Sequence, residues 1–273
     1  MVCISGNDVD FSYRKNQPIL ENLNFEIESG KITAILGRNG CGKSTLIKLL
    51  SALVPLSSGK ISVCGVDINS KEDIPEVRKH CGIVFQNPDN QFVSPIVEDD
   101  ISFGLTNHHI PESEHKERIR SALKTAGMDG FEKRSIFTLS GGQKQRIAVA
   151  GILAIDCDIL IFDESTSMLD PEGKEELNQV IRHLRSKNKT IIVITQNITD
   201  VLQADQILLM SDHRIIFSGT AREVLTNYEC LKEAGVEIPF SVRVYHDLLE
   251  KGIRLNSCPL TVEELAEEIC NLN

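Results

Sequence analysis

The glycine-rich stretch at residues 37–45 constrains the fold of this chain more than any other feature. A short apolar run at 32–36 precedes it, and residues 44–53 have the apolar spacing of a helix. Glycines between a buried strand and a helix let backbone N–H groups point inward, and the helix N-terminus adds positive potential. The pattern predicts a phosphate-binding loop in which Lys43 reaches the terminal phosphates, Ser44 contacts Mg²⁺ and Thr45 lies near the α-phosphate. A chance glycine turn is the alternative, and the flanking strand and helix argue against it.

An acidic pair ends a second apolar run. Residues 159–162 are apolar and are followed by Asp163 and Glu164. A charged pair at the tip of a buried strand is unfavourable unless something compensates it. After a phosphate-binding loop, the pair is typical of a site in which Asp163 holds Mg²⁺ and Glu164 acts as a general base. Taken alone, the same pair is equally compatible with an ordinary helix N-cap.

Ser140-Gly141-Gly142-Gln143 opens a predicted apolar helix at 141–155. A serine N-cap followed by two glycines gives a helix N-terminus that a ligand can approach closely. An ordinary helix cap would not require this sequence. We therefore expect a second anion-binding element at this helix N-terminus. The chain has no second phosphate-binding loop that could supply the phosphate for it.

These three motifs, in this order, resemble the ATP-binding cassette (ABC) ATPases, and the resemblance covers about residues 1–220. It implies ATP and Mg²⁺ as ligands and a head-to-tail dimer, in which Ser140–Gln143 of one subunit caps the γ-phosphate bound by its partner. It also implies that Gln86 ligates Mg²⁺ beside Ser44 and Asp163, and that Asp170 lies in a loop crossing the dimer interface. Tyr13 is expected to stack on adenine, with an ordinary strand aromatic as the alternative. The implied nucleotide-contacting set is Tyr13, Gly37, Arg38, Asn39, Gly40, Cys41, Gly42, Lys43, Ser44, Thr45, Ser140, Gly141, Gly142, Gln143 and Asp170.

One position departs from the family. After the predicted strand at 190–194, ABC ATPases usually carry a histidine that contacts the γ-phosphate and the attacking water, and this chain has Gln196. Glutamine can hydrogen-bond but cannot titrate. If orientation of Glu164 and water is the requirement, Gln196 can partly replace the histidine. If a proton-shuttling or cationic group is required, turnover falls by roughly 10²- to 10⁴-fold. We therefore count Gln196 with Glu164 and Gln86 as catalytic candidates.

Three further stretches are similar to the ATPase subunits of energy-coupling factor (ECF) transporters, importers of vitamins or transition metals. They are residues 86–105, residues 163–173 and the tail around 239–240 and 260–265, which looks like the first of two paralogous ATPases. The resemblance implies a second ABC ATPase, with a heterodimer favoured over a homodimer. It also implies a transmembrane T component bound in a groove after Gln86, an S component that carries the substrate, and a peripheral position on the cytoplasmic face of the membrane.

Three other functions remain open. A conventional ABC importer, for example for cobalt or nickel, would share every site residue. A non-transport ABC protein of the DNA-repair type would need a coiled-coil arm between Lys43 and Ser140, and no sustained heptads occur there. A module that clamps ATP without hydrolysis would explain Gln196 but has little use for Glu164.

Composition narrows the functional class. A net charge of −10 disfavours nucleic acid as a partner. The longest uncharged apolar stretch, 147–155, is far shorter than the roughly 20 residues that span a bilayer, and no secretory signal is apparent. The eight cysteines show no Cys-x-x-Cys and predict free buried thiols. Cys41 lies near a helix N-terminus that can lower the pKa of a thiol, but a small residue that fits the loop is the favoured interpretation. His108, His109 and His115 fit no metal motif and are expected in a solvated loop.

The pattern of elements predicts an α/β fold with a mostly parallel sheet, flanking helices and N-terminal antiparallel strands. Strands are expected at 2–12, 21–29, 32–36, 61–66, 82–85, 159–163, 190–194, 206–210 and 213–217. Helices are expected at 44–53, 98–105, 112–126, 141–155, 173–186, 197–203 and 221–226, with two or three more in the tail. We expect an ABC ATPase domain at 1–227, with its nucleotide-binding core at 1–90 and 157–227 and an inserted helical subdomain at 91–156. Residues 228–273 would form a C-terminal dimerisation extension.

Overall fold

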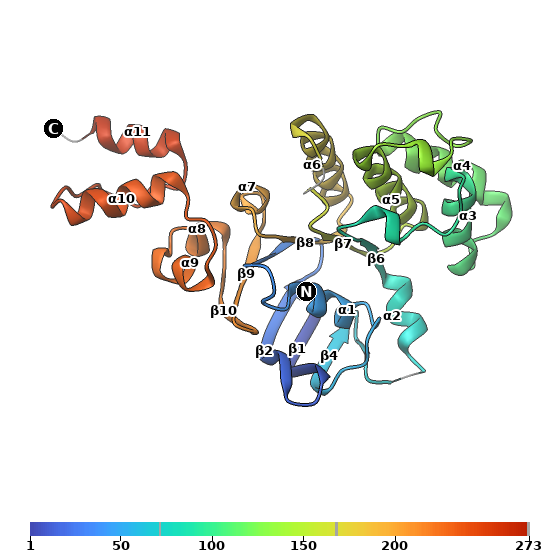
Figure 1. The fold of residues 1–273 in the computed structure, drawn as a ribbon, viewed down its shortest axis with the longest axis horizontal. Helices are drawn as coiled ribbons and strands as arrows, with labels where there is room; N and C mark the ends of the chain where they lie inside the picture. The colour runs from blue at the N-terminus through green and yellow to red at the C-terminus, as the bar shows by residue number, and fades with distance from the viewer. Residues whose placement is uncertain (71, 167–168, 272–273) are drawn as a thin grey trace.

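The computed structural model describes residues 1–70, 72–166 and 169–271, and it contains two sheets flanked by helices (Figure 1). The first sheet has the strand order β2-β1-β4-β5, and its neighbouring strands are antiparallel. Its strands are β1 (Val2–Arg14), β2 (Gln17–Glu28), β4 (Ser58–Val63) and β5 (Val66–Asp67). This sheet confirms the predicted N-terminal antiparallel strands.

The second sheet has the order β10-β9-β3-β8-β7-β6 and is parallel from β9 to β6. Its strands are β3 (Ile32–Leu36), β6 (Cys81–Val84), β7 (Ile159–Asp163), β8 (Thr190–Thr195), β9 (Gln206–Ser211) and the antiparallel edge strand β10 (Arg214–Gly219). Because β3, β7 and β8 are buried along their whole length, their sequences are nearly continuous apolar runs. Their carboxyl ends meet at one edge of the sheet, where polar side chains from distant segments come together.

Strand alternation divides the core between the two faces of this sheet. Ile35, Ile161 and Ile192 face the antiparallel sheet and α1 (Lys43–Leu50). Their neighbours Ala34, Phe162 and Val193 pack on the other face. Helices α6 (Pro171–Ser186), α7 (Ile198–Val201) and α8 (Ala221–Leu225) contribute apolar side chains to that second face. The sheet is therefore covered on both sides, as a mainly parallel sheet requires.

Three helices form a separate apolar cluster: α3 (Val97–Asn107), α4 (Glu112–Thr125) and α5 (Gly141–Ile155). Figure 1 shows this group at one end of the molecule, with the C-terminal helices at the opposite end. The latter are α9 (Tyr228–Ala234), α10 (Phe240–Glu250) and α11 (Val262–Cys270). The arrangement supports our proposal of an inserted helical subdomain at 91–156 and an extension at 228–273. No helix within the described ranges is long and apolar enough to cross a bilayer.

The structure confirms the predicted fold class and nearly all predicted elements, although several bounds shift, as at β2, which begins at Gln17 and not at residue 21. Two differences among the strands and α-helices go beyond such shifts. The strand expected at 61–66 is divided by a turn at Cys64 and Gly65, which both have positive φ. Helix α2 (Ile74–His80) was not predicted, because it is short and contains Pro75. Proline is tolerated in the first turn of a helix, where its missing N–H would have no intrahelical partner.

Candidate functional site

The glycine loop connects β3 to α1 at the carboxyl edge of the parallel sheet. Gly40 and Gly42 have φ values of +84° and +108°, which favour glycine. Gly42 is the N-cap of α1, and because it has no side chain the first N–H groups of the helix receive no side-chain cap. The loop therefore presents backbone donors at a helix N-terminus, the geometry of an anion site.

Lys43 folds back over this loop. Its Nζ donates to the carbonyl oxygens of Gly37 at 2.7 Å and Arg38 at 3.0 Å, and it lies 3.8 Å from Glu164 Oε1. Only 4% of the Lys43 side chain is exposed. A buried ammonium is tolerated only when it is well paired. Lys43 is thus held beside the loop, within reach of the acidic pair.

The acidic pair at the end of β7 contacts the glycine loop that follows β3. Ser44 Oγ donates to Asp163 Oδ1 at 3.3 Å, and Asp163 is buried. Burial raises the pKa of Asp163, although the Ser44 hydroxyl partly offsets this effect. A divalent cation would favour the charged carboxylate, and carboxylate and hydroxyl oxygens are ligands that Mg²⁺ accepts. The donors at this edge therefore fit Mg²⁺ together with a nucleotide triphosphate.

Glu164 is held by groups from two neighbouring strands. Its backbone N–H donates to the Ile194 carbonyl of β8 at 3.0 Å, and its Oε2 accepts from Gln86 Nε2 at 2.7 Å. Its φ of +46° is unusual for a residue with a side chain. Gln86, two residues beyond β6, thus lies beside the carboxylate that we predicted as the general base.

Gln196 follows the last residue of β8 and is exposed to solvent. Next to it lies a polar network that the sequence analysis did not identify. Asp200 Oδ2 accepts from the hydroxyls of Thr166 and Thr195, each at 2.9 Å. This network ties the segment after Glu164 to the segment that carries Gln196. No spacing rule indicated it, because Thr166 is 34 residues from Asp200 and joins it only in the folded chain.

Ser140 forms a complete capping box at the start of α5. Its Oγ accepts from the Gln143 backbone N–H at 3.3 Å, and Gln143 Oε1 accepts from the Ser140 N–H at 3.0 Å. A Cβ on Gly142 would lie 3.3 Å from Leu169 Cδ2, whereas one on Gly141 would have nothing within 4 Å. The contacts of this motif lie within the first turn of α5 or with Leu169, and within the described residues none joins it to the glycine loop of the same chain.

The remaining predicted residues have ordinary local roles in this structure. Asp170 caps α6 by accepting from Gly173 N–H at 2.9 Å. Tyr13 is 54% exposed, with its ring edge-on to Phe11. Arg38 forms an ion pair with Asp212. Asn39 is exposed and Thr45 is buried.

Two expectations about thiols and histidines were wrong, whereas Cys41 agrees with the favoured interpretation of a small residue that fits the loop. Cys41 is buried, and burial raises its pKa rather than lowering it. Cys64 and Cys270 are exposed, so the thiols are not uniformly buried. His115 is also not in a solvated loop: it is buried in α4, where its ring nitrogens contact Ser102 Oγ and the Ile110 carbonyl.

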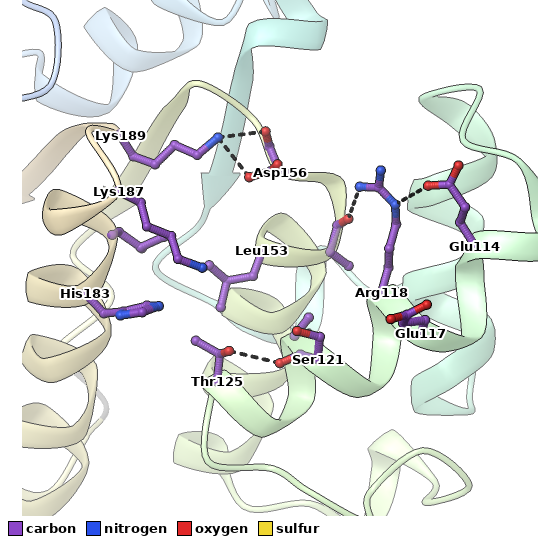
Figure 2. A pocket seen from close by; sticks show the side chains of 13 residues that line it. Glu114, Glu117, Arg118, Ser121, Thr125, Leu153, Asp156, His183, Lys187 and Lys189 are labelled. Atoms are coloured by element: carbon purple, nitrogen blue, oxygen red, sulfur yellow. Dashed lines mark hydrogen bonds and ion pairs between the residues drawn. The ribbon is translucent and has the colours of Figure 1, made fainter.

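A hollow between α4, the end of α5 and α6 is separate from this site (Figure 2). Lys189 donates to the Asp156 carbonyl and pairs with its carboxylate at 2.8 Å. Arg118 bonds to Glu114 and to the Ala154 carbonyl. None of the predicted site residues lines this hollow. The bond from Arg118 to Ala154 joins α4 to α5, and the pair of Lys189 with Asp156 joins the end of α5 to the segment before β8.

Comparison with known proteins assigns the family. A sequence profile described as ABC transporter matches residues 20–167. The chain is 42% identical to the energy-coupling factor transporter ATP-binding protein EcfA1 of Ureaplasma parvum, over 98% of this chain and 91% of that protein. It is also 42% identical to EcfA1 of Ligilactobacillus salivarius, over 98% of this chain and 95% of that protein.

Solved structures show the same fold. CbiO1 from Clostridium perfringens, described as part of the ABC transporter complex cbiONQ, superposes with a TM-score of 0.76 at 34% identity, covering 90% of this chain and 99% of that one. The ATP-binding cassette MJ0796, a dimer bound to ADP and phosphate, gives a TM-score of 0.74 at 25% identity, covering 80% of this chain and 99% of the other.

Proposed function

Because the chain belongs to the ABC transporter ATPase family, we propose that it is the ATP-hydrolysing subunit of an ECF-type importer, corresponding to the first of the two paralogous ATPases. Its full-length relatives are named EcfA1, in agreement with the resemblance found in the tail. The single observation that carries the catalytic part is the meeting of the glycine loop and the acidic pair, through Ser44 with Asp163 and Lys43 with Glu164.

Each residue at this edge has a proposed role in hydrolysis. Lys43 and the N–H groups of the loop bind the phosphates. Ser44, Asp163 and Gln86 would hold Mg²⁺, which would neutralise phosphate charge in the transition state. Glu164 accepts a proton from the attacking water, and its bond to Gln86 orients its carboxylate. Tyr13 stacks on adenine with its exposed ring.

Residues 140–143 at the start of α5, which we call the signature motif, act on a partner. Ser140, Gly141, Gly142 and Gln143 cap the γ-phosphate bound by the other subunit, and Asp170 lies at the interface. The support is steric: Gly141 has open space where its Cβ would be, so another chain can approach it closely. The C-terminal extension strengthens this dimer through exposed apolar side chains such as Phe240, Val262 and Ile269. We propose a second ABC ATPase as this partner.

Gln196 sets the rate at this chain's own site. It occupies the position of the family's histidine, beside the network of Asp200, Thr166 and Thr195. We propose that the site hydrolyses ATP slowly, while the chain's signature motif completes a faster site on the partner. Turnover of the assembled complex with Gln196→His should rise, and no change would show that glutamine does not impair the site.

A surface groove beside the segment after Gln86 supports the proposal of a membrane partner. It is lined by the apolar side chains of Leu53, Phe92, Val93 and Phe103, among others. Leu53, Val93 and Phe103 are strongly exposed for their type. Exposed apolar patches of this kind mark interaction sites. We propose that the coupling helices of a T component bind here, which places the chain peripherally on the cytoplasmic face of the membrane. ATP closes the dimer by binding the closed state better, and the groove transmits this closure.

A tagged pull-down from gently solubilised native membranes tests the whole proposal. Recovery of a second ABC ATPase, a T component and small substrate-binding membrane proteins would establish it, and the last group would identify the vitamins or metals carried. A second candidate is the ATPase of a conventional ABC importer, for example for cobalt or nickel, which would share every site residue. Recovery with two conventional permeases would select that class, and recovery of only soluble or nucleic-acid-bound partners would overturn the transport proposal.

A further inference from the structure

Two cysteines that are distant in sequence lie against each other in the first sheet. Cys3 is on β1, and Cys64 begins the turn between β4 and β5, one position beyond the pair Ile4 and Val63. The Cys64 N–H donates to the Cys3 carbonyl at 2.7 Å, and the two Sγ atoms are 3.4 Å apart. The backbone ladder therefore holds the two thiols face to face.

This placement suits a covalent bond between the sulfurs. A hydrogen-bonded antiparallel pair has Cα atoms about 5.5 Å apart, within the roughly 4.4–6.8 Å span of disulfides. A disulfide requires a sulfur separation of about 2.05 Å. The sulfurs of Cys3 and Cys64 can reach this distance by small side-chain rotations, with the strands left in place.

The two thiols differ from their neighbours in reactivity. The hydrogen bond from Cys64 lowers the pKa of Cys3 to about 7, and the same contact raises the pKa of Cys64. Nearby Cys81 and Cys157 are buried, and burial raises the pKa of each to about 12. Cys3 is also buried, but its neighbour Cys64 is exposed, so solvent reaches the pair at Cys64, and the lowered pKa of Cys3 favours its thiolate over those of Cys81 and Cys157.

We propose that Cys3 and Cys64 form a dithiol that hydrogen peroxide oxidises reversibly to a disulfide. The Cys3 thiolate attacks one peroxide oxygen and becomes a sulfenic acid, while the other oxygen takes a proton and leaves as water. The Cys64 sulfur then attacks the sulfenic sulfur, and the displaced hydroxide takes the Cys64 proton and leaves as a second water. Two electrons pass from the two sulfurs to the peroxide, and a thiol reductant reverses the bond.

The disulfide between Cys3 and Cys64 would protect Cys3 from irreversible oxidation, at a position away from the nucleotide site. Thr190, which hydrogen-bonds to Cys3, begins β8, whereas the candidate site lies at the carboxyl ends of the parallel strands. A resolving thiol at 3.4 Å captures the sulfenic acid before it reaches the irreversible sulfinic state. The closed loop, residues 3–64, also contains the whole glycine loop and α1.

Mass spectrometry of the full chain tests this proposal. The reduced protein is treated with one equivalent of hydrogen peroxide, its remaining thiols are alkylated, and it is digested with trypsin without reduction. Cys3 falls in tryptic peptide 1–14 and Cys64 in peptide 61–71. We expect these peptides to be recovered as one disulfide-linked species, with two of the eight thiols lost per chain and regained on treatment with dithiothreitol.

Two variants serve as controls. Cys64→Ser should abolish the linked species and leave Cys3 as a sulfenic or sulfinic acid, whereas Cys270→Ser, which removes an exposed cysteine elsewhere, should leave the yield unchanged. The proposal is overturned if oxidised wild-type protein shows both peptides unlinked, or if Cys3 is linked to Cys81 or Cys157 instead. Both results are read from wild-type protein, so they do not depend on how well a variant folds.

Discussion

Replacing Gly42 by alanine should destabilise the chain far more than the same change at Gly40. Both residues have φ in the left-handed region, where a Cβ costs roughly 1–2 kcal/mol. At Gly40 nothing lies within 4 Å of the added carbon. At Gly42 it would lie 2.6 Å from Leu20 Cδ2 and 2.7 Å from the Ile19 carbonyl oxygen.

The two contacts at Gly42 differ in how easily they can be relieved. The leucine methyl can rotate away, but the Ile19 carbonyl belongs to β2, whose neighbouring residues Pro18 and Leu20 pair with β1. Overpacking against such a group costs roughly 1–3 kcal/mol beyond the backbone strain. We therefore expect about 2–5 kcal/mol for Gly42→Ala and about 1–2 kcal/mol for Gly40→Ala.

Thermal unfolding followed by circular dichroism, without nucleotide, measures the difference. At about 2–4 °C per kcal/mol, Gly42→Ala should unfold roughly 2–12 °C below Gly40→Ala. Gly141→Ala is a second control, because its Cβ meets nothing within 4 Å, and it should unfold close to the wild-type temperature. Equal melting temperatures for the Gly42 and Gly40 variants would refute the steric reasoning.

Three further predictions concern the site and the groove. Because burial raises the pKa of Asp163, the folded state binds its proton more tightly, and the charged carboxylate destabilises the fold as pH rises through that pKa. Asp163→Asn should therefore unfold at a higher temperature than wild type at pH 7 and lose ATP hydrolysis, and the stability gain should vanish below about pH 3.8, the ordinary pKa. Glu164→Gln should keep ATP binding in a filter assay but lower turnover by about 10²- to 10⁴-fold, and near-normal turnover would exclude it as the general base. Phe103→Asp should leave ATP binding unchanged but reduce co-purification with the T component, and undiminished recovery would place that contact elsewhere.

The candidate site and most of the elements could be predicted from the sequence, because the signals for both are local. A glycine loop between a strand and a helix, and an acidic pair after an apolar run, can be identified within about ten residues. The continuous apolar runs of β3, β7 and β8 likewise predicted buried parallel strands.

Only the tertiary structure decided which distant side chains meet. Ser44 and Asp163 are 119 residues apart, Gln86 and Glu164 are 78 apart, and Cys3 and Cys64 are 61 apart. These contacts depend on strand order and register, which placed β7 between β6 and β8 and put Cys64 opposite Cys3. Apolar periodicity indicates that a strand is buried but does not specify its neighbours, because every buried apolar strand presents nearly the same pattern to either side.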